Sequence, residues 1–201
     1  METMKHFTSL FDAPVWSHDH AGIEEDKLKD YILDLKSKDK GRVISNRLGW
    51  QSNSLHLQTP ELQQFFQSIL IDLNYYYKEI NGHTDKYEVM IDQAWANVNT
   101  NGAFNWPHAH TGFLSVVYYV EADEDTGMLR FIHPSILMRN EWQSQWFKHE
   151  NTSCTASSWN FTPKTNRCFI FPSWLEHLVD INNTSKTRIS IALNTRLIKR
   201  T

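Results

Sequence analysis

The sequence predicts a mainly β (α+β) fold, a β-sandwich or barrel with N-terminal helices packed outside it. Two segments with the apolar period of a helix come first, and short runs of β-branched and aromatic residues follow after position 86. Six or more short strands after two helices are typical of this class. We expect a single domain over residues 1–201, with a helical part at about 20–85 and a β core at about 87–197.

The first helix is expected at about 24–38, because apolar residues recur there every three or four positions among charged ones. The second is expected at about 60–80. Thr59 suits the N-cap, Pro60 suits the first helical position, and a long apolar stripe follows them. Asn81-Gly82 should end this helix, since glycine is common just past a helix end.

The predicted strands are bounded by polar turns at 124–127 and 182–186. They cover residues 87–99, 113–121, 128–133, 168–171, 177–181 and 187–197. The polar, tryptophan-rich segment 135–166 is interpreted as a long excursion near the mouth of the barrel.

The last strand has two different faces, as the two-residue period of a strand requires. One face is apolar and the other is mostly polar, with Ile189, Ile191 and Leu193 on the first and Arg188, Ser190, Ala192 and Asn194 on the second. The polar face would meet solvent in a sandwich edge or line the interior of a barrel.

Composition and charge narrow the class of protein. With 40% hydrophobic residues, 7 Gly and 6 Pro, the chain is not of a disordered or collagen-like class. The net charge of −3 and the lack of a Lys/Arg stripe make nucleic acid an unexpected partner. No apolar run approaches the roughly 20 residues needed to cross a bilayer, so no membrane partner is expected.

The N-terminus and the cysteines bear on location. Residues 1–16 lack the apolar core of a signal peptide. Cys154 and Cys168 have no metal-ligand spacing and are too few for a disulfide framework, which favours a reducing, cytoplasmic compartment. A single disulfide between the two cysteines stays open.

Three histidines form the candidate metal site. His108 and His110 are two residues apart, so in an extended segment both imidazoles project from the same side. The His-x-His spacing alone is a weak signal, because histidines also serve in cores and on surfaces. His177 follows a predicted strand and a proline corner, and it would complete one face of a coordination sphere. Neutral imidazole suits iron, zinc, copper and nickel.

Arg188 and Ser190 form a candidate anion site on the strand after His177. A planar guanidinium grips a carboxylate through two parallel hydrogen bonds, and a hydroxyl on the same face supplies a third.

Together these residues resemble the iron(II)- and 2-oxoglutarate-dependent oxygenases, whose motif is His-x-Asp/Glu, a distal His and Arg-x-Ser. Beyond the motif, the chain is similar to a bacterial and phage branch of that superfamily at residues 10–15, 49–52, 114–120, 171–177 and 188–194. The resemblance extends from 10 to 194, and 95–194 is its most specific part.

The resemblance implies a double-stranded β-helix (jelly-roll, cupin-like) with Fe(II) as the metal and 2-oxoglutarate as the cosubstrate. His108 and His177 would be iron ligands, and Arg188 with Ser190 would bind the far carboxylate of 2-oxoglutarate. The implied reaction decarboxylates 2-oxoglutarate to succinate and hydroxylates an unactivated C–H bond of the substrate.

His110 departs from the family pattern, because it stands where a carboxylate normally completes the triad. We expect it to be the third ligand, although water or a carboxylate from elsewhere are alternatives. Neutral imidazole in place of a carboxylate raises the formal charge of the ligand set by one, so weaker discrimination between metals is expected.

Other polar residues near the motif receive weaker interpretations. Asn105 is expected close to the cosubstrate, whereas Asn97 and Asn99 are interpreted as backbone caps. Tyr118 and Tyr119 lie on opposite faces of one strand, and either could point into the barrel.

The remaining tryptophans and histidines are not assigned a specific chemical role. Four tryptophans are expected near the mouth, as a substrate platform or buried under a loop: Trp142, Trp146, Trp159 and Trp174. His133 has no partner pattern. His18-x-His20 repeats the metal-ligand spacing but has no matching socket in the sequence, so it is interpreted as surface.

Two other functions fit the same motif. One is a cupin-like metalloenzyme that uses three histidines without 2-oxoglutarate, and the other is a catalytically silent jelly-roll binding module. The sequence leaves the substrate open among protein side chains, nucleotides, lipids and small metabolites, and it does not indicate the oligomeric state.

Overall fold

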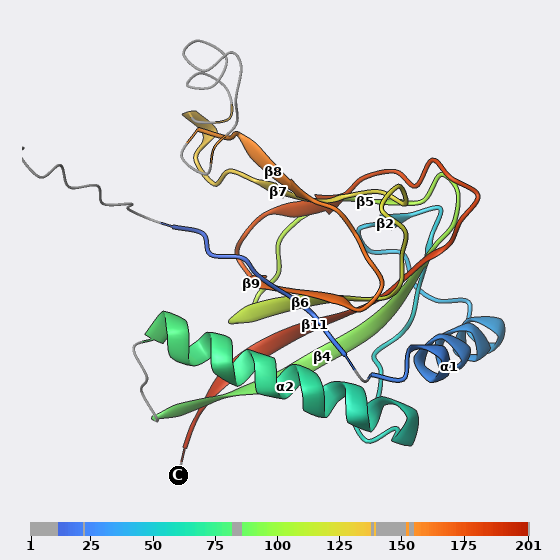
Figure 1. Cartoon of the computed structure of the whole chain (residues 1–201), viewed down its shortest axis with the longest axis horizontal. Helices are drawn as coiled ribbons and strands as arrows, with labels where there is room; N and C mark the ends of the chain where they lie inside the picture. Colours follow the sequence, from blue (N-terminus) through green and yellow to red (C-terminus); the bar gives the residue numbers. More distant parts are fainter. Residues whose placement is uncertain are drawn as a thin grey trace, which may run out of the picture.

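Figure 1 shows the computed structural model of the chain, which describes residues 12–21, 23–81, 86–137, 139, 152 and 155–200. Within these ranges, eleven strands form two antiparallel sheets that face each other, and two helices lie on one side of the larger sheet.

The larger sheet has six strands in the order β1-β9-β6-β11-β4-β3. In this order they are Trp16–Asp19, Arg167–Pro172, Leu114–Glu121, Arg188–Lys199, Tyr87–Asn99 and Trp50–Gln51. β11 pairs with β4 along its full length, from Arg188 opposite Asn99 to Lys199 opposite Tyr87.

The smaller sheet has five strands in the order β2-β5-β10-β7-β8. They are Asn46–Arg47, Phe104–His108, His177–Val179, Leu129–Ile132 and Ser158–Phe161.

From β4 onward the chain winds between the two sheets. β4, β6, β9 and β11 belong to the larger sheet, whereas β5, β7, β8 and β10 belong to the smaller one. Antiparallel strands wound in this way form a double-stranded β-helix. The predicted fold class is confirmed.

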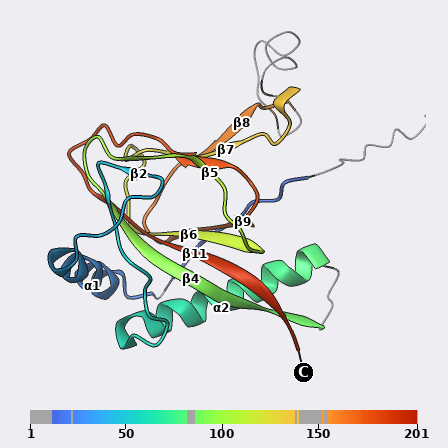
Figure 2. The same cartoon turned by 180° about the vertical axis from the view of Figure 1, so that it is seen from behind.

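The helices α1 (Glu25–Lys38) and α2 (Pro60–Asn81) pack on the outer face of the larger sheet (Figures 1 and 2). The inner side of α2 is an apolar stripe at three-to-four-residue spacing, made of Leu62, Phe65, Ile69 and Leu73, and all four are buried. Burial of this stripe against the sheet holds α2 in place.

The larger sheet separates two apolar clusters, because side chains alternate between its faces. Tyr118, Cys168 and Ile191 pack with the helices on the outer face. Tyr119 and Phe169 pack on the inner face, between the sheets. Neighbouring residues on one strand therefore serve opposite sides of the sheet.

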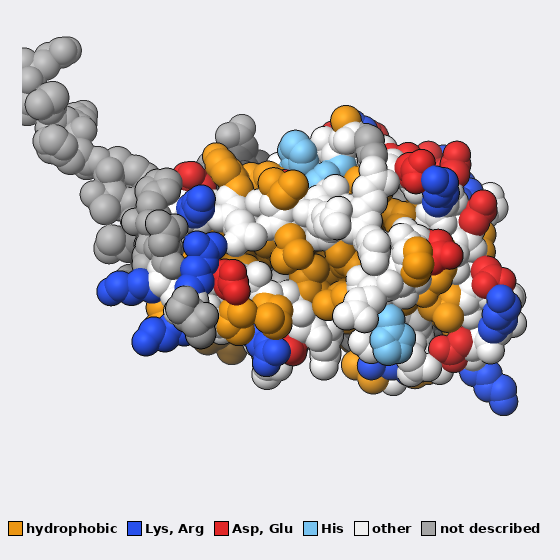
Figure 3. All heavy atoms as spheres, turned by 90° about the horizontal axis from the view of Figure 1, so that it is seen from below, with side chains coloured by type: hydrophobic (Ala, Val, Ile, Leu, Met, Phe, Trp, Pro, Cys, Tyr) orange, Lys and Arg blue, Asp and Glu red, His pale blue; other side chains and the backbone are white. Residues whose placement is uncertain are grey.

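The outer side of α2 is of mixed character. Figure 3 views the molecule from below Figure 1 and shows apolar side chains among charged ones, and on α2 both Ile71 and Tyr75 are exposed. In the described part of the chain, neither helix combines the length with the sustained apolar character that crossing a bilayer requires.

Most elements lie where the sequence predicted them. Both helices and six strands, β4, β6, β7, β9, β10 and β11, have ends within two residues of the predicted ones. β1, β2, β3 and β5 were not predicted as strands, since β2 and β3 have only two residues each and show no period. β8 corrects the interpretation of 135–166 as an uninterrupted excursion.

Candidate active site

A cavity of about 270 Å³ lies between the two sheets. Its walls bring together His108, His110 and His177 from the smaller-sheet side with Arg188 and Ser190 on β11 of the larger sheet. All of the residues that the sequence singled out for metal and anion binding therefore face one space. The polar face of β11, with Ala192 and Asn194, is the inner one.

Two of the histidines face each other across neighbouring strands. His177 opens β10 and pairs directly with His108, the last residue of β5. Their ring centroids are 4.4 Å apart. The His177 side chain is only 3% exposed and packs against Phe171 and Phe131. Strand register thus fixes two imidazoles side by side at the end of β5.

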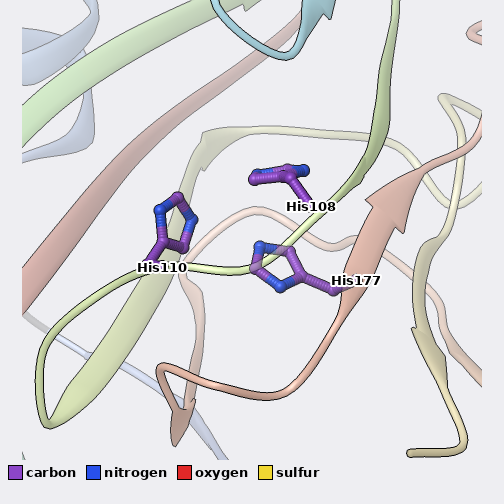
Figure 4. A group of neighbouring side chains, drawn as sticks. All are labelled: His108, His110 and His177. Atoms are coloured by element: carbon purple, nitrogen blue, oxygen red, sulfur yellow. The ribbon is translucent and has the colours of Figure 1, made fainter.

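His110 completes the group from the loop that follows β5 (Figure 4). Its ring centroid lies 4.9 Å from that of His108 and 5.2 Å from that of His177. Its backbone N–H donates to the carbonyl of Ser173 at 2.9 Å, which joins this loop to the turn before His177. One ligand nitrogen from each histidine lies within 4.8 Å of the others.

Gly112 lets this loop pass close to β11. It has φ +132°, and a Cβ there would come 2.7 Å from the carbonyl oxygen of Thr195. Both the backbone conformation and the close approach favour glycine.

Backbone carbonyls orient two of the three rings. His108 Nδ1 donates to the carbonyl of Trp106 at 2.6 Å, and His177 Nδ1 donates to the carbonyl of Leu175 at 2.9 Å. A carbonyl only accepts, so Nδ1 carries the hydrogen and Nε2 keeps its lone pair. This arrangement is typical of metal-ligating histidines.

The histidines are neutral at pH 7. Burial, helped by repulsion from His108, lowers the pKa of His177 to about 3 and that of His110 to about 4. Burial also lowers the pKa of His108. Neutral imidazole is the form that binds a metal ion, so all three rings are ready to act as ligands.

Arg188 is held by the turn that precedes β7. Its side chain is 3% exposed, and Nη1 donates to the carbonyls of Thr126 and Gly127, at 2.9 Å for the latter. Gly127 has φ +98°, and a Cβ there would collide with the carbonyl oxygen of Asp180 and approach Nη1 to 2.7 Å. The turn therefore requires glycine to bring its carbonyls to the guanidinium.

Arg188 is a buried charge with no carboxylate at ion-pair distance among the described residues, and Asp180, which pairs with Arg130, acts on it only from farther away. Burial lowers its pKa. Of the described residues that line the cavity, none is Asp or Glu, while Arg42 adds a second guanidinium to the wall. Among the described lining residues, no carboxylate is therefore present that could replace His110 as the third metal ligand. A buried charge of this kind calls for a counter-ion.

Polar side chains from three neighbouring strands form a row beside Arg188. Ser190 on β11 pairs with Tyr119 on β6 and with Asn97 on β4. Asn97 Nδ2 donates to Ser190 Oγ at 3.5 Å, and its buried Oδ1 has no partner among the described residues. Tyr119 is thus the tyrosine that faces the cavity, which settles the alternative between Tyr118 and Tyr119.

The interpretation of Asn97 and Asn99 as backbone caps is wrong. Both belong to β4 and line the cavity, Asn99 as the strand partner of Arg188. The period of the strand that ends at Asn99 was the signal, because odd positions from 95 to 99 fall on one face.

Asn105 also lines the cavity, where it is bonded to other side chains. Its Nδ2 donates to Ser45 Oγ at 3.1 Å, and its Oδ1 accepts from Asn99 Nδ2 at 3.5 Å. Ser45 Oγ in turn lies 3.5 Å from His108 Nε2. Asn105 therefore connects the histidine group to the polar row on β4.

Of the other singled-out residues, those that the structure describes do not line this cavity. Trp159 and Trp174 are 42% and 53% exposed, whereas Trp142, Trp146 and Cys154 fall outside the described residues. His133 Nδ1 accepts from the backbone N–H of Ser135. The interpretation of His18-x-His20 as surface is wrong for His20, whose side chain is 7% exposed beside Asp72.

The cavity of this double-stranded β-helix thus combines three neutral imidazoles with an arginine that has no carboxylate at ion-pair distance among the described residues. A family model described as "Putative 2OG-Fe(II) oxygenase" matches residues 93–194, half of the 201-residue chain. The chain belongs to this family, whose members are oxidoreductases that use Fe(II) and 2-oxoglutarate. A search of the curated proteins found no match.

Solved structures with the same fold are distant in sequence. A prolyl-4-hydroxylase from Pseudomonas putida has a TM-score of 0.63 and 12% identity, with 94% of each chain covered. HygX from Streptomyces hygroscopicus, solved with nickel and 2-oxoglutarate bound, has a TM-score of 0.60 and 10% identity over 92% of this chain and 83% of HygX.

A third structure contains a peptide. It is a prolyl hydroxylase in complex with a hypoxia inducible factor oxygen degradation domain peptide fragment, from Trichoplax adhaerens. Its TM-score is 0.59 and its identity is 14%, over 91% of this chain and 82% of that one. At such identities the similarity establishes the fold.

Proposed function

We propose that His108, His110 and His177 bind Fe(II), and that Arg188, Ser190 and Asn105 position 2-oxoglutarate for the hydroxylation of a C–H bond. The observation that carries this assignment is Arg188. It is a buried guanidinium without a carboxylate at ion-pair distance in the described structure, and it opens into the same cavity as the three imidazoles.

The donor set fits a divalent iron ion. Three neutral nitrogen donors within 4.8 Å of one another suit one face of an octahedral ion and leave positions for other ligands. The carbonyls of Trp106 and Leu175 hold two of the rings in the required tautomer. The hydrophobic contacts of His177 fix its orientation.

The charge balance fits 2-oxoglutarate. Three imidazoles contribute no negative charge, so a bound divalent cation leaves the cavity strongly positive beside Arg188. A dianion with two separate carboxylates neutralises both charges, with one carboxylate at the metal and the other at the guanidinium. Ser190 and Tyr119 add hydroxyl donors near Arg188, since they pair across β11 and β6.

When bound, Fe(II) and 2-oxoglutarate would supply the oxidation chemistry, in which dioxygen gives one atom to succinate, formed with release of CO2, and the other to the substrate C–H bond. The chain contributes orientation and charge placement. Arg188 fixes the far end of the cosubstrate through a two-point contact, and the two carbonyls on Nη1 hold that guanidinium still.

We also propose that the protein works in a reducing compartment such as the cytoplasm. Cys168 is a free, fully buried thiol on β9. Burial raises its pKa, and the nearby Asp72 carboxylate adds to this shift, so it stays protonated and unreactive.

Arg188→Lys tests the assignment of the cosubstrate site. We expect the purified chain with Fe(II) and 2-oxoglutarate to show the weak visible absorption of a metal–keto-acid chelate, and to form succinate slowly in air. Arg188→Lys should weaken apparent 2-oxoglutarate affinity about ten- to hundredfold, because losing a charge-assisted hydrogen bond costs about 1.5–3 kcal/mol. An ammonium cannot reproduce the planar two-point contact.

Arg196→Lys is the matched control, since Arg196 lies on the same strand but its side chain is exposed. It should leave absorption and succinate formation unchanged. An iron-loaded protein with neither signal, and with Arg188→Lys indistinguishable from wild type, would overturn the assignment. The cupin-like enzyme or the binding module would then remain.

A further inference from the structure

A second group of metal-ligand side chains lies on the opposite face of the larger sheet. His18 on β1, His20 just after β1 and Asp72 on α2 each offer one ligand atom, and these atoms lie within 4.8 Å of one another. The His20 ring contacts Tyr118, which belongs to the outer apolar cluster. The group is therefore separated from the active-site cavity by the sheet itself.

His20 and Asp72 form a close ion-pair contact whose geometry is not that of a hydrogen bond. Nε2 of His20 and Oδ2 of Asp72 are 2.7 Å apart, and their side chains are 7% and 14% exposed. Both atoms are buried, yet neither has a hydrogen-bond partner in the described structure. At this distance the missing bond means that the two atoms lie side by side, with the carboxylate oxygen off the N–H direction.

Two ligands of one metal ion have this relation. Zinc binds a histidine nitrogen and a carboxylate oxygen at about 2.0–2.2 Å each, so two such atoms on a tetrahedral ion are about 3.4 Å apart and both point at the ion. The 2.7 Å pair would open by about 0.7 Å to take an ion between its atoms. A buried polar pair left without hydrogen bonds is costly, and an ion between the two atoms would satisfy both.

His18 supplies a third ligand from the solvent side. It lies two residues before His20, so an extended backbone projects both imidazoles from the same face. The two ring centroids are 4.8 Å apart at an interplanar angle of 84°. His18 is exposed, and its ring stacks on that of Trp16. Solvent can fill the other coordination positions.

Two other polar side chains near the group, Tyr118 and Cys168, are not available as metal ligands. The hydroxyl of Tyr118 donates to Asn166 Oδ1 at 3.2 Å. Cys168 is the strand partner of His18, but burial keeps its thiol protonated. The ligand set is then two imidazoles and one carboxylate, a mixture that suits zinc and other first-row divalent ions.

We propose that His18, His20 and Asp72 bind a divalent transition-metal ion such as zinc, distinct from the active-site metal. The ion joins β1, the edge strand of the larger sheet, to α2, and so fastens the N-terminal segment to the helix layer. This proposal does not depend on the proposed oxygenase function.

Zinc titration of the untagged full chain tests the site. By equilibrium dialysis and metal analysis, wild type should bind two zinc ions. His20→Ala and Asp72→Asn should each bind one, and so should His177→Ala, which keeps the outer site. The double variant His177→Ala/Asp72→Asn should bind none. Zinc should raise the thermal unfolding midpoint of His177→Ala but not that of the double variant.

His18→Ala guards against a folding artefact, because His18 is exposed and its ring contacts are a stack on the half-buried Trp16 and an edge contact with His20. It should weaken the outer site by at least about tenfold, as loss of a ligand exceeds the effect of losing an outer-shell partner. His56→Ala, at another exposed histidine, should bind zinc like wild type. Unchanged zinc stoichiometry and affinity in His18→Ala, with Asp72→Asn equally destabilised with and without zinc, would overturn the proposal and leave an ion pair only.

Discussion

The two His-x-His segments of this chain share one spacing but lie in different surroundings. His108 and His110 face the cavity between the sheets, together with His177, Arg188 and no lining carboxylate among the described residues. His18 and His20 lie on the outer side of the larger sheet, where Asp72 of α2 approaches them. The spacing places two imidazoles on one side of the backbone, and tertiary structure decides what joins them.

The surroundings also decide what each group can do. The inner group adjoins a buried guanidinium that calls for an anion, so it can hold a metal and a charged small molecule together. The outer group packs between a strand and a helix, which suits a structural role, and the nearby Lys164 and Arg167 are already paired with Asp19. The inner group lies in a cavity of about 270 Å³, as the binding of a small molecule requires.

The largest expected effect comes from His110, the residue that distinguishes the inner group from the usual triad. His110→Ala should abolish succinate formation, by at least about 100-fold, because a ligand is lost. His110→Asp makes the inner group two imidazoles and one carboxylate, like the outer one, and should retain turnover. Succinate assays with Fe(II) measure both.

His20→Ala serves as the control for this prediction. It removes an imidazole with the same spacing from the outer group and should leave succinate formation unchanged. Full activity in His110→Ala would show that His110 is not a ligand, and that water or a carboxylate from elsewhere takes the third position.

The strand pattern of β11 predicted much of the active site. Because side chains alternate, the sequence placed Arg188 and Ser190 on one face, and the structure shows that face inside the cavity. The pairing of His177 with His108 depends on register between strands 69 residues apart, and the turn at Gly127 that grips Arg188 is equally remote from it in sequence. The alternation of side chains along one strand carries no information on contacts between residues so far apart in the sequence.

The missed residues have the same cause. Asp72 lies in a helix that was predicted correctly, but nothing in the sequence relates it to His20, since the contact arises from packing of α2 beside β1. Asn97 was set aside because asparagine is common in turns, and its strand position outweighed that tendency. Short strands such as β2 carry too few residues for any period.

Acid should affect the metal-free protein through the inner group. The folded pKa values of His110 and His177 are about 4 and about 3, below the ordinary value of 6.5. Between these values and pH 6.5 the unfolded chain binds more protons than the folded one. The free energy of unfolding should therefore fall as pH decreases from about 6.5 toward 4.

Urea denaturation of the metal-free protein at several pH values measures this dependence. The double variant His110→Ala/His177→Ala lacks both groups and should show a flatter slope over the same range. If its slope equals that of wild type, the two histidines are not buried in the neutral state, and the inner cavity is more open than the structure shows.

The smallest expected effects come from two substitutions on opposite faces of β6, Tyr119→Phe and Tyr118→Phe. Tyr119→Phe removes a hydroxyl beside Ser190 and near Arg188, whose charge acts on the tyrosine. It should raise the 2-oxoglutarate concentration needed for half-maximal succinate formation about two- to tenfold, the value of one hydrogen bond of about 0.5–1.5 kcal/mol. Tyr118→Phe removes a hydroxyl that bonds only Asn166 on the helix side, so it should lower the free energy of unfolding by a similar amount without changing that concentration. Because the two substitutions are chemically identical and one residue apart, equal effects on 2-oxoglutarate dependence would contradict the assignment of Tyr119 to the cosubstrate site, whatever the metal bound.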